Sequence, residues 1–245
     1  MPFFILSILM QVALVVHIIK TGRDTKWVWI VVMLPLAGSI AYLLLEVLPD
    51  VSNTRAGRAA GKKVKSVVNP NKDINQATKQ FAISDTVENS MNLAQECFNK
   101  GLFSDAKSLY EKCLKGAHVG DAHLMFGLAR SFFELGEYLD VKATLDSLID
   151  INPEYKNADA HLLYARTLEK LNEVAAALEE YEALHGYFPG PEASYYFATF
   201  LKKQNQNEKA KAVFQQIVDT ASNSGKHYNS MHKEYVKDSK RELSL

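Results

Sequence analysis

Residues 122–136 read AHLMFGLARSFFELG and residues 158–172 read ADAHLLYARTLEKLN, and the pattern that they share decides the fold of the chain. Two more segments, which begin at Val87 and Pro191, carry the same pattern, so four segments start at intervals of 35, 36 and 33 residues. Each segment has a small residue at its eighth place, an apolar residue at its eleventh and Gly or Asn at its fifteenth. A repeat of about 34 residues with these features predicts a row of helical hairpins, each packed against the next.

The residue types at the shared places indicate how such a hairpin packs. Small residues at the eighth and twentieth places let its two helices approach closely, and a large residue at the twenty-fourth fills the space between hairpins. Gly or Asn at the fifteenth place suits the left-handed backbone that ends a helix. In the order of the four segments, the residues are Ala94, Ala129, Ala165 and Ala198 at the eighth place, Cys97, Phe132, Leu168 and Leu201 at the eleventh, Gly101, Gly136, Asn172 and Asn205 at the fifteenth, Ala106, Val141, Ala177 and Ala210 at the twentieth, and Tyr110, Leu145, Tyr181 and Phe214 at the twenty-fourth.

On these residues, and on pairs such as Leu128-Ala129 and Tyr164-Ala165, the chain resembles the tetratricopeptide repeat (TPR) family over more than half of its length. The resemblance implies an all-α fold, with a TPR α-solenoid of about four repeats in residues 84–223. The repeats would start near residues 87, 122, 158 and 191. A capping helix with a polar outer face is expected after the last repeat, and we place it with the tail in residues 224–245.

Two apolar runs precede the repeats. Residues 3–19 contain only three polar side chains, and residues 27–48 carry a single charge, Glu46. At about 1.5 Å per helical residue, both runs reach the length that crosses a bilayer, the first of them barely. A signal peptide is the alternative for the first run, but that run lacks a positive start and a small-residue cleavage site, and a second run follows it. The sequence therefore predicts a two-helix transmembrane anchor within residues 1–49.

The anchor carries a resemblance of its own. Residues 17–27, HIIKTGRDTKW, and residues 34–44, LPLAGSIAYLL, are similar to the two-helix N-terminal membrane module of bacterial cardiolipin synthases, in the phospholipase D group. Pro35 and Gly38 lie inside the second run, where membrane helices tolerate both residue types. The resemblance implies a membrane anchor in a bacterial protein. It implies no lipid-synthase chemistry, because the paired His-x-Lys-x4-Asp motifs of those enzymes are absent.

Charge is unevenly distributed, although the chain has 28 basic and 28 acidic side chains. Residues 50–83 lack a sustained apolar period and are predicted to form a basic, flexible linker. Five of its basic residues closely follow the second apolar run, which favours a cytoplasmic repeat domain and offers a contact for anionic lipid. They are Arg55, Arg58, Lys62, Lys63 and Lys65. A solvated topology signal without lipid specificity is the alternative, and the charge pattern indicates no nucleic-acid-binding surface.

The groove of the predicted solenoid is where the TPR resemblance implies a protein or peptide partner. In the family, places two, five, nine, twelve and thirteen of each first helix usually carry the ligand contacts. Arg130 and Arg166 share place nine in neighbouring repeats, so we expect both in one groove, beside aromatic rings that can anchor a partner. The alternative is that the rings pack against adjacent repeats and the arginines pair with Glu134 or Glu169. The candidate binding residues are Phe126, Arg130, Phe133, Leu162, Arg166, Lys170, Tyr195, Thr199 and Lys202.

Motifs for catalysis, metal binding or cofactor binding are absent from the sequence. The seven histidines show no metal-ligand spacing, and neither a Gly-rich phosphate loop nor a nucleophile elbow occurs. Cys97 and Cys113 are expected as packed thiols, with a disulfide across the first hairpin as the alternative. Gln11 is expected to hydrogen-bond between the two anchor helices, and His17 either to do the same or to reach the membrane surface.

These patterns predict a non-enzymatic protein that needs neither cofactor nor metal. The first hypothesis is a TPR scaffold or adaptor, anchored as a multi-pass protein in a bacterial inner membrane, which binds a protein or peptide at the cytoplasmic face. The alternative is a non-catalytic accessory subunit of a phospholipid or envelope-biogenesis enzyme that acts through the membrane hairpin. The sequence indicates neither the identity of the partner nor the oligomeric state.

Overall fold

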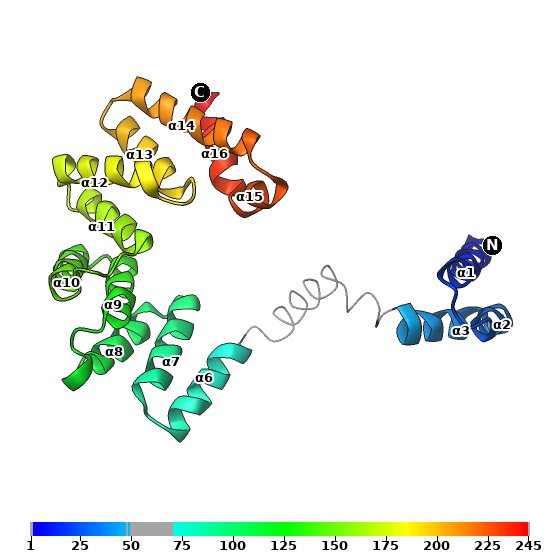
Figure 1. Cartoon of the computed structure of the whole chain (residues 1–245). Coiled ribbons are helices and arrows are strands. Elements are labelled where there is room, and N and C mark those ends of the chain that lie inside the picture. Colours follow the sequence, from blue (N-terminus) through cyan, green and yellow to red (C-terminus); the bar gives the residue numbers. More distant parts are fainter. Residues whose placement is uncertain (1, 48, 50–70, 245) are drawn as a thin grey trace. The chain divides into compact units, whose positions relative to one another are not determined.

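The computed structural model describes residues 2–47, 49 and 71–244 (Figure 1). These residues form helices and turns, with no β-strand among them, and the predicted all-α fold is confirmed. The chain divides into two compact units, Met1–Lys72 and Asp73–Leu245. Five basic residues singled out as a possible lipid contact lie outside the described residues, together with most of the predicted linker. They are Arg55, Arg58, Lys62, Lys63 and Lys65.

The first unit contains both apolar runs. Its elements are α1 (Pro2–Thr21), α2 (Lys26–Met33), α3 (Pro35–Tyr42) and a π-helical turn, η1 (Leu43–Val47). The expectation of one helix over residues 27–48 is therefore wrong, because the second run breaks at Leu34. Pro35 has no N–H for the helix ladder and disfavours helical backbone at the residue before it. Leu34 accordingly has φ −124° and ψ 79°.

A side chain of α1 replaces the backbone hydrogen bond that Pro35 removes. In an unbroken helix the Val31 carbonyl would accept from the N–H of residue 35. Instead, Gln11 Nε2 donates to the Val31 carbonyl at 2.8 Å, which confirms the predicted hydrogen bond between the anchor segments. Gly38 allows α3 to lie close to α2, because a Cβ at that position would be 2.3 Å from the Ile30 carbonyl oxygen.

The core of the first unit is small and partly polar. Val31 and Tyr42 are fully buried, and the Tyr42 hydroxyl lies 2.9 Å from His17 Nδ1. His17 therefore pairs with α3. An ion pair of 2.7 Å between Arg23 and Glu46 joins the loop after α1 to η1.

The outside of the first unit is mostly apolar. Large apolar side chains on α1, α2 and η1 are more than half exposed, and the strongest examples are Leu9, Ile19, Trp29, Met33 and Leu45. Across the described residues, no helix has both the length and the apolar character that crossing a membrane requires.

The second unit is a row of helical hairpins, as the repeat predicted, and in Figure 1 they follow one another from green to orange. Within each hairpin, and from one hairpin to the next, the helices pack against each other. The hairpins are α7 (Val87–Asn99) with α8 (Phe103–Cys113), α9 (Ala122–Leu135) with α10 (Tyr138–Ile151), α11 (Ala158–Lys170) with α12 (Val174–Tyr187), and α13 (Glu192–Lys203) with α14 (Asn207–Asn223). A short 3-10 helix, η2 (Gly116–His118), follows the first hairpin.

The shared places behave alike in all four hairpins. The alanines at the eighth place have no exposed surface, and the residues at the twentieth and twenty-fourth places are also buried. At the fifteenth place the backbone is left-handed, with φ of 75° at Gly101, 80° at Gly136, 59° at Asn172 and 61° at Asn205. The sequence repeat thus corresponds to a repeat in backbone and packing.

One helix lies where the sequence predicted a flexible linker. Helix α6 (Lys72–Ile83) precedes the first hairpin, so the linker does not extend to residue 83. Ala77 is buried in the core, and Ile74 and Phe81 pack against it. These residues are three, four and seven positions apart and so lie on one face of a helix, a short pattern that the polar composition concealed.

The segment after the last hairpin forms two helices where one capping helix was expected. They are α15 (Lys226–Met231) and α16 (Lys233–Leu243). Helix α16 packs against α14 and α13 and buries Val236, while most of its charged side chains face outward. It covers the apolar side of the last repeat, as a solenoid cap does.

Both cysteines of the first repeat are free thiols. Cys97 and Cys113 are buried, and burial raises the pKa of each thiol. The disulfide alternative is therefore not supported. The two side chains fill space within the hairpin core, as small apolar residues do.

Ion pairs connect successive repeats at equivalent places. Lys107 of α8 lies 2.5 Å from Glu137 of the second repeat, and Lys142 of α10 lies 2.7 Å from Glu173 of the third. In each case the lysine is at place twenty-one, and the glutamate is at place sixteen of the following repeat. The hydrogen bond to Glu137 raises the pKa of Lys107.

Candidate functional site

A groove runs along the first helices of the repeats. It has a volume of about 390 Å³ and is lined by side chains of α7, α9, α11 and α13. Its lining combines rings, guanidinium groups and carboxylates, and it comprises Phe98, Phe126, Arg130, Glu134, Asp159, Leu162, Leu163, Arg166 and Glu192. We call this surface the repeat groove. Four of the predicted binding residues therefore lie together in it, namely Phe126, Arg130, Leu162 and Arg166.

Arg130 is held in the groove by two rings. Its guanidinium carbon lies 4.1 Å from the centre of the Phe98 ring and 5.8 Å from that of Phe126. Arg130 also donates a hydrogen bond of 3.4 Å to Gln95, which occupies the same place nine in the first repeat. Equivalent places of neighbouring repeats thus face each other across the groove, as the repeat predicted.

Arg166 lies between two rings of different repeats. Its guanidinium carbon is 4.6 Å from the centre of Phe133 and 4.5 Å from that of Tyr196. Within the described part of the chain, neither Arg166 nor Arg130 forms an ion pair with a carboxylate. The alternative that the arginines pair with Glu134 or Glu169 is therefore wrong, because the rings hold both guanidinium groups instead. Each retains N–H donors that a ligand can use.

Several candidate binding residues have packing roles. Phe133 and Leu162 are 7% and 4% exposed, so neither offers much surface to a partner. Phe133 packs edge-on against Tyr138 of the same hairpin. The alternative that rings pack within the array therefore holds for Phe133. Phe126 is half-buried and Lys170 is exposed, so these two are more accessible.

Two of the three candidates in the fourth repeat, Tyr195 and Lys202, contact α16. The Tyr195 ring centre is 5.5 Å from that of Tyr235, and Lys202 forms an ion pair of 2.6 Å with Glu242. The Thr199 hydroxyl donates to the carbonyl of Tyr195. The sequence pattern placed these residues in an open groove, whereas the C-terminal helix contacts that face of the last repeat. The free groove is therefore formed mainly by the first three repeats.

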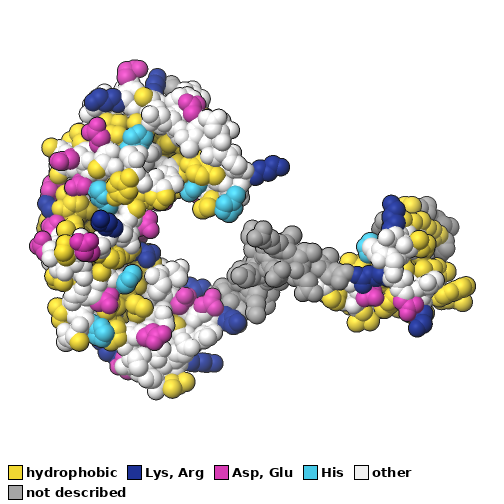
Figure 2. All heavy atoms as spheres, in the orientation of Figure 1, with side chains coloured by type: hydrophobic (Ala, Val, Ile, Leu, Met, Phe, Trp, Pro, Cys, Tyr) yellow, Lys and Arg dark blue, Asp and Glu magenta, His cyan; other side chains and the backbone are white. Residues whose placement is uncertain are grey.

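Charges of both signs are interspersed over the second unit, as Figure 2 shows. In the groove, Glu134 and Asp159 are exposed, and Glu192 is half-buried. Burial raises the pKa of Tyr235, and the Glu192 carboxylate contributes to the shift. The groove is thus a mixed surface, with two cations held against rings and carboxylates at its edge.

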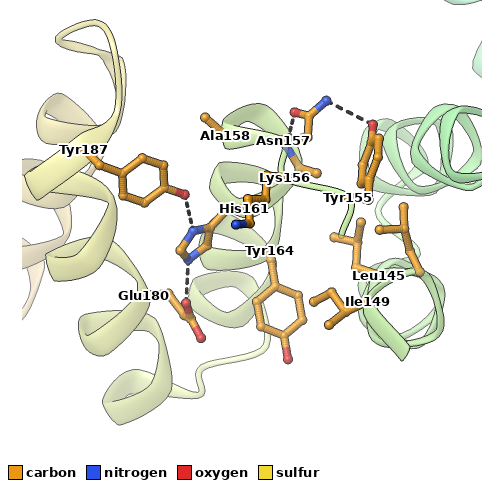
Figure 3. Close-up of a pocket in the computed structure, with 12 residues that line it drawn as sticks. Leu145, Ile149, Tyr155, Lys156, Asn157, Ala158, His161, Tyr164, Glu180 and Tyr187 are labelled. Carbon is orange, nitrogen blue, oxygen red and sulfur yellow. Dashed lines mark hydrogen bonds and ion pairs between the residues drawn. The ribbon is translucent and has the colours of Figure 1, made fainter. Parts of the chain in front are cut away.

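A second pocket lies on the other side of α11 (Figure 3). It has a volume of about 550 Å³ and lies between α10, the loop before α11, and α12. We call it the outer pocket, and none of its lining residues lines the repeat groove. His161, Glu180 and Tyr187 form a hydrogen-bonded chain in it. The His161 Nδ1 lies 2.5 Å from the Tyr187 hydroxyl, and His161 Nε2 lies 2.5 Å from Glu180 Oε2.

Some residues that form the repeat groove and the outer pocket were not predicted from the sequence. Phe98 and Tyr196 hold the arginines, yet the first was left out of the candidate set and the second is not at a family contact place. Phe98 and Phe133 share place twelve, one repeat before Arg130 and Arg166, and this shared place was the available signal. For the outer pocket, the sequence offered no sign that a tyrosine and a glutamate, 26 and 19 positions away from His161, meet its ring.

Comparisons with known proteins agree with the two-part architecture. A family model described as Phospholipase D-nuclease N-terminal matches residues 9–45, and one described as Tetratricopeptide repeat matches residues 192–224. The chain is a tetratricopeptide repeat protein, and its N-terminal module is similar to that of cardiolipin synthases. A search of the curated proteins found no match.

Solved structures resemble the chain through the same fold. A thermophilic TPR protein of Thermus thermophilus is 14% identical with a TM-score of 0.58, over 76% of this chain and 97% of that one. Two structures of MamA are 20% and 19% identical, with TM-scores of 0.53 and 0.51. They cover 65% and 78% of this chain, and 94% and 96% of their own. At these identities the likeness establishes the fold.

Proposed function

We propose that the protein is a membrane-anchored TPR scaffold that holds a protein or peptide partner in the repeat groove. The observation that carries the proposal is the pair of guanidinium groups, Arg130 and Arg166, held on aromatic rings without a carboxylate partner in the described chain. A scaffold of this kind needs no catalytic group, cofactor or metal.

The two arginine side chains are preorganised for binding, because the rings fix their positions in the free protein. A guanidinium over a ring face gains about 0.5–2 kcal/mol, more as water is excluded. Most of the entropy of ordering these long side chains is therefore lost in the free protein, which lowers the cost of binding. A partner carboxylate or backbone carbonyl that accepts from Arg130 or Arg166 would add about 1.5–3 kcal/mol for a hydrogen bond to a charged group.

The contacts that helix α16 makes with the fourth repeat support the proposal that the partner is helical. On the fourth repeat it presents Tyr235 to the rings of Tyr195 and Tyr196, and it presents Glu242 to Lys202. The first helix of that repeat is equivalent to those that line the groove. A partner helix with an aromatic residue and a carboxylate would use the same chemistry on the first three repeats.

Membrane anchoring is proposed for the first unit. Its exposed apolar side chains form a surface that a small unit in water would be expected to bury. The similarity of residues 9–45 to the phospholipase D group supports the same role. The basic residues after the anchor favour repeats on the cytoplasmic side of a bacterial inner membrane.

Charge reversal in the groove tests partner binding. A photoreactive amino acid at Lys170, which is exposed, would be used in cells to capture the partner, followed by mass spectrometry. We expect one dominant protein, and we expect Arg130→Glu with Arg166→Glu to abolish its capture. Lys209→Glu with Lys211→Glu, on the exposed side of α14, is the matched control. Capture that survives the groove reversal would refute the groove as the binding site.

Anchoring and sidedness need a separate experiment. Inner-membrane vesicles of known orientation would be washed with alkaline carbonate and then treated with protease. We expect the protein to stay in the membrane fraction, with repeats cleaved only where the cytoplasmic face is outside. Release by carbonate would overturn the anchor, and cleavage only from the opposite face would overturn the topology.

An anchor exchange separates the scaffold from the accessory-subunit alternative. A scaffold should keep its function when residues 1–49 are replaced by an unrelated membrane anchor. Loss of function with the repeats still folded and membrane-bound would favour an accessory subunit that acts through the hairpin.

A further inference from the structure

The outer pocket has one polar side and one apolar side. Figure 3 shows Tyr187 and Glu180 of α12 with His161 of α11 between them, and Leu145 and Ile149 of α10 across the pocket. The pocket is separated from the repeat groove by α11, whose residues Asp159 and Arg166 face that groove. A ligand of the outer pocket would therefore bind independently of a ligand of the groove.

The polar side offers hydrogen-bond acceptors. A carboxylate can only accept, so His161 Nε2 carries the proton that is donated to Glu180. In the neutral ring Nδ1 is then an acceptor, and the Tyr187 hydroxyl donates to it. The groups that remain are lone pairs of the Tyr187 oxygen and Glu180 Oε1, the latter with no hydrogen bond within the described chain.

The Glu180 carboxylate makes this side negative. The side chains of His161 and Glu180 are 26% and 33% exposed, so their interactions are only partly screened by water. Burial raises the pKa of Tyr164, and the Asp146 carboxylate of α10 contributes to the shift. Burial and the nearby Glu180 raise the pKa of Tyr187 as well, so both phenols stay protonated at neutral pH.

The rest of the pocket is apolar and firmly built. Leu145 and Leu148 are each 2% exposed and form its base. Asn157 holds the loop, because its Oδ1 accepts from the backbone N–H groups of Asp159 and Ala160. Its Nδ2 donates to the Tyr155 hydroxyl at 3.0 Å. A ligand would therefore enter a preformed space rather than a loose loop.

We propose that the outer pocket binds an arginine side chain of a protein partner. The aliphatic stem would lie along Leu145 and Ile149, and the planar guanidinium would donate to Glu180 and to the Tyr187 oxygen. Arginine suits this arrangement because its fixed N–H donors match a carboxylate and its flat face stacks on tyrosine rings. The pocket volume of about 550 Å³ accommodates such a side chain together with neighbouring atoms of the peptide.

Lys156 adds a positive charge to the same pocket, and this charge distinguishes a cationic ligand from an anionic one. It is exposed and forms no ion pair with a carboxylate within the described residues. A bound guanidinium is repelled by Lys156, whereas a bound anion would be attracted. The substitution Lys156→Ala should therefore tighten the binding of arginine and weaken that of any anionic ligand.

The experiment uses the full-length protein in detergent micelles and two short capped peptides, one with a central arginine and one with citrulline. Citrulline has nearly the same shape as arginine and no charge. Binding would be followed through the ring Cε1–H NMR signal of His161, assigned by its loss in His161→Gln. We expect the arginine peptide to bind at least about tenfold more tightly than the citrulline peptide.

Variants complete the test. Glu180→Gln should weaken arginine binding several-fold, Lys156→Ala should strengthen it, and Glu182→Gln, exposed on the same helix, should leave it unchanged. Equal binding of both peptides, or weaker binding in Lys156→Ala, would overturn the proposal. The Arg130→Glu, Arg166→Glu protein should bind the arginine peptide normally, so failure of the groove and failure of the outer pocket can be told apart.

Discussion

At the residue scale, four equivalent positions carry the backbone geometry that makes the repeat possible. Gly101, Gly136, Asn172 and Asn205 all have φ between 59° and 80°. Side chains other than Gly and Asn rarely adopt this region, because their Cβ approaches the following carbonyl oxygen. The turn between the helices of each hairpin therefore depends on a residue that tolerates positive φ, which explains why only Gly and Asn occur there.

The third repeat allows this dependence to be measured. Asn172→Ala should destabilise the repeat unit by about 1 kcal/mol, because alanine is strained at φ 59°. Asn172→Gly is the matched control and should be neutral or slightly stabilising. The measurement is the denaturant midpoint by far-UV circular dichroism of the full chain. An alanine variant as stable as the glycine variant would contradict the explanation.

At the element scale, the break between α2 and α3 links a proline in one segment to a glutamine in another. Pro35 leaves the Val31 carbonyl without its helical partner, and Gln11 on α1 supplies the missing donor at 2.8 Å. The same break brings α3 so near to α2 that only glycine fits at position 38. The packing of the three helices is therefore a consequence of the kink.

A double-mutant cycle tests this link. Gln11→Leu alone should destabilise the first unit by about 1–3 kcal/mol, because it leaves a carbonyl unsatisfied. In a Pro35→Ala background the backbone N–H of residue 35 can take over, so the same change should cost much less.

The two tryptophans, Trp27 and Trp29, both lie in the first unit, so their fluorescence reports on that unit alone during thermal unfolding in micelles. Equal effects of Gln11→Leu in both backgrounds would show that Gln11 acts in another way.

At the scale of the whole molecule, the repeat unit is a chain of neighbour-to-neighbour contacts closed by a cap. Lys107 with Glu137 and Lys142 with Glu173 join successive repeats, and α16 covers the last one. In such an array a local change spreads mainly to adjacent repeats. The cap also decides how much of the groove is open to a partner.

Loss of the cap should therefore act locally. Val236→Asp places a charge at a position that is 8% exposed and should detach α16. Amide hydrogen exchange should then rise strongly in α13 and α14 and little in α7 to α10. Lys237→Asp, at an exposed neighbouring position, is the control. An even rise over all repeats would contradict the nearest-neighbour description.

Features that depend on nearby residues could be predicted from the sequence. The hairpins follow from a period of about 34 residues, the close helix pairs from alanine at place eight, and the turns from Gly or Asn at place fifteen. The meeting of Arg130 and Arg166 in one groove followed from their shared place. In each case the physical cause lies within one repeat and its copy, so the pattern is visible along the chain.

Tertiary structure alone decided which distant groups meet. The pairing of Gln11 with the Val31 carbonyl, the contact of the Tyr196 ring with Arg166 and the cover that α16 places over Tyr195 all join segments without a fixed spacing. The hydrogen bonds that link Glu180, His161 and Tyr187 also join segments without a fixed spacing. Periodicity specifies which face of a helix is buried, whereas the choice of what covers that face depends on the packing of the whole unit.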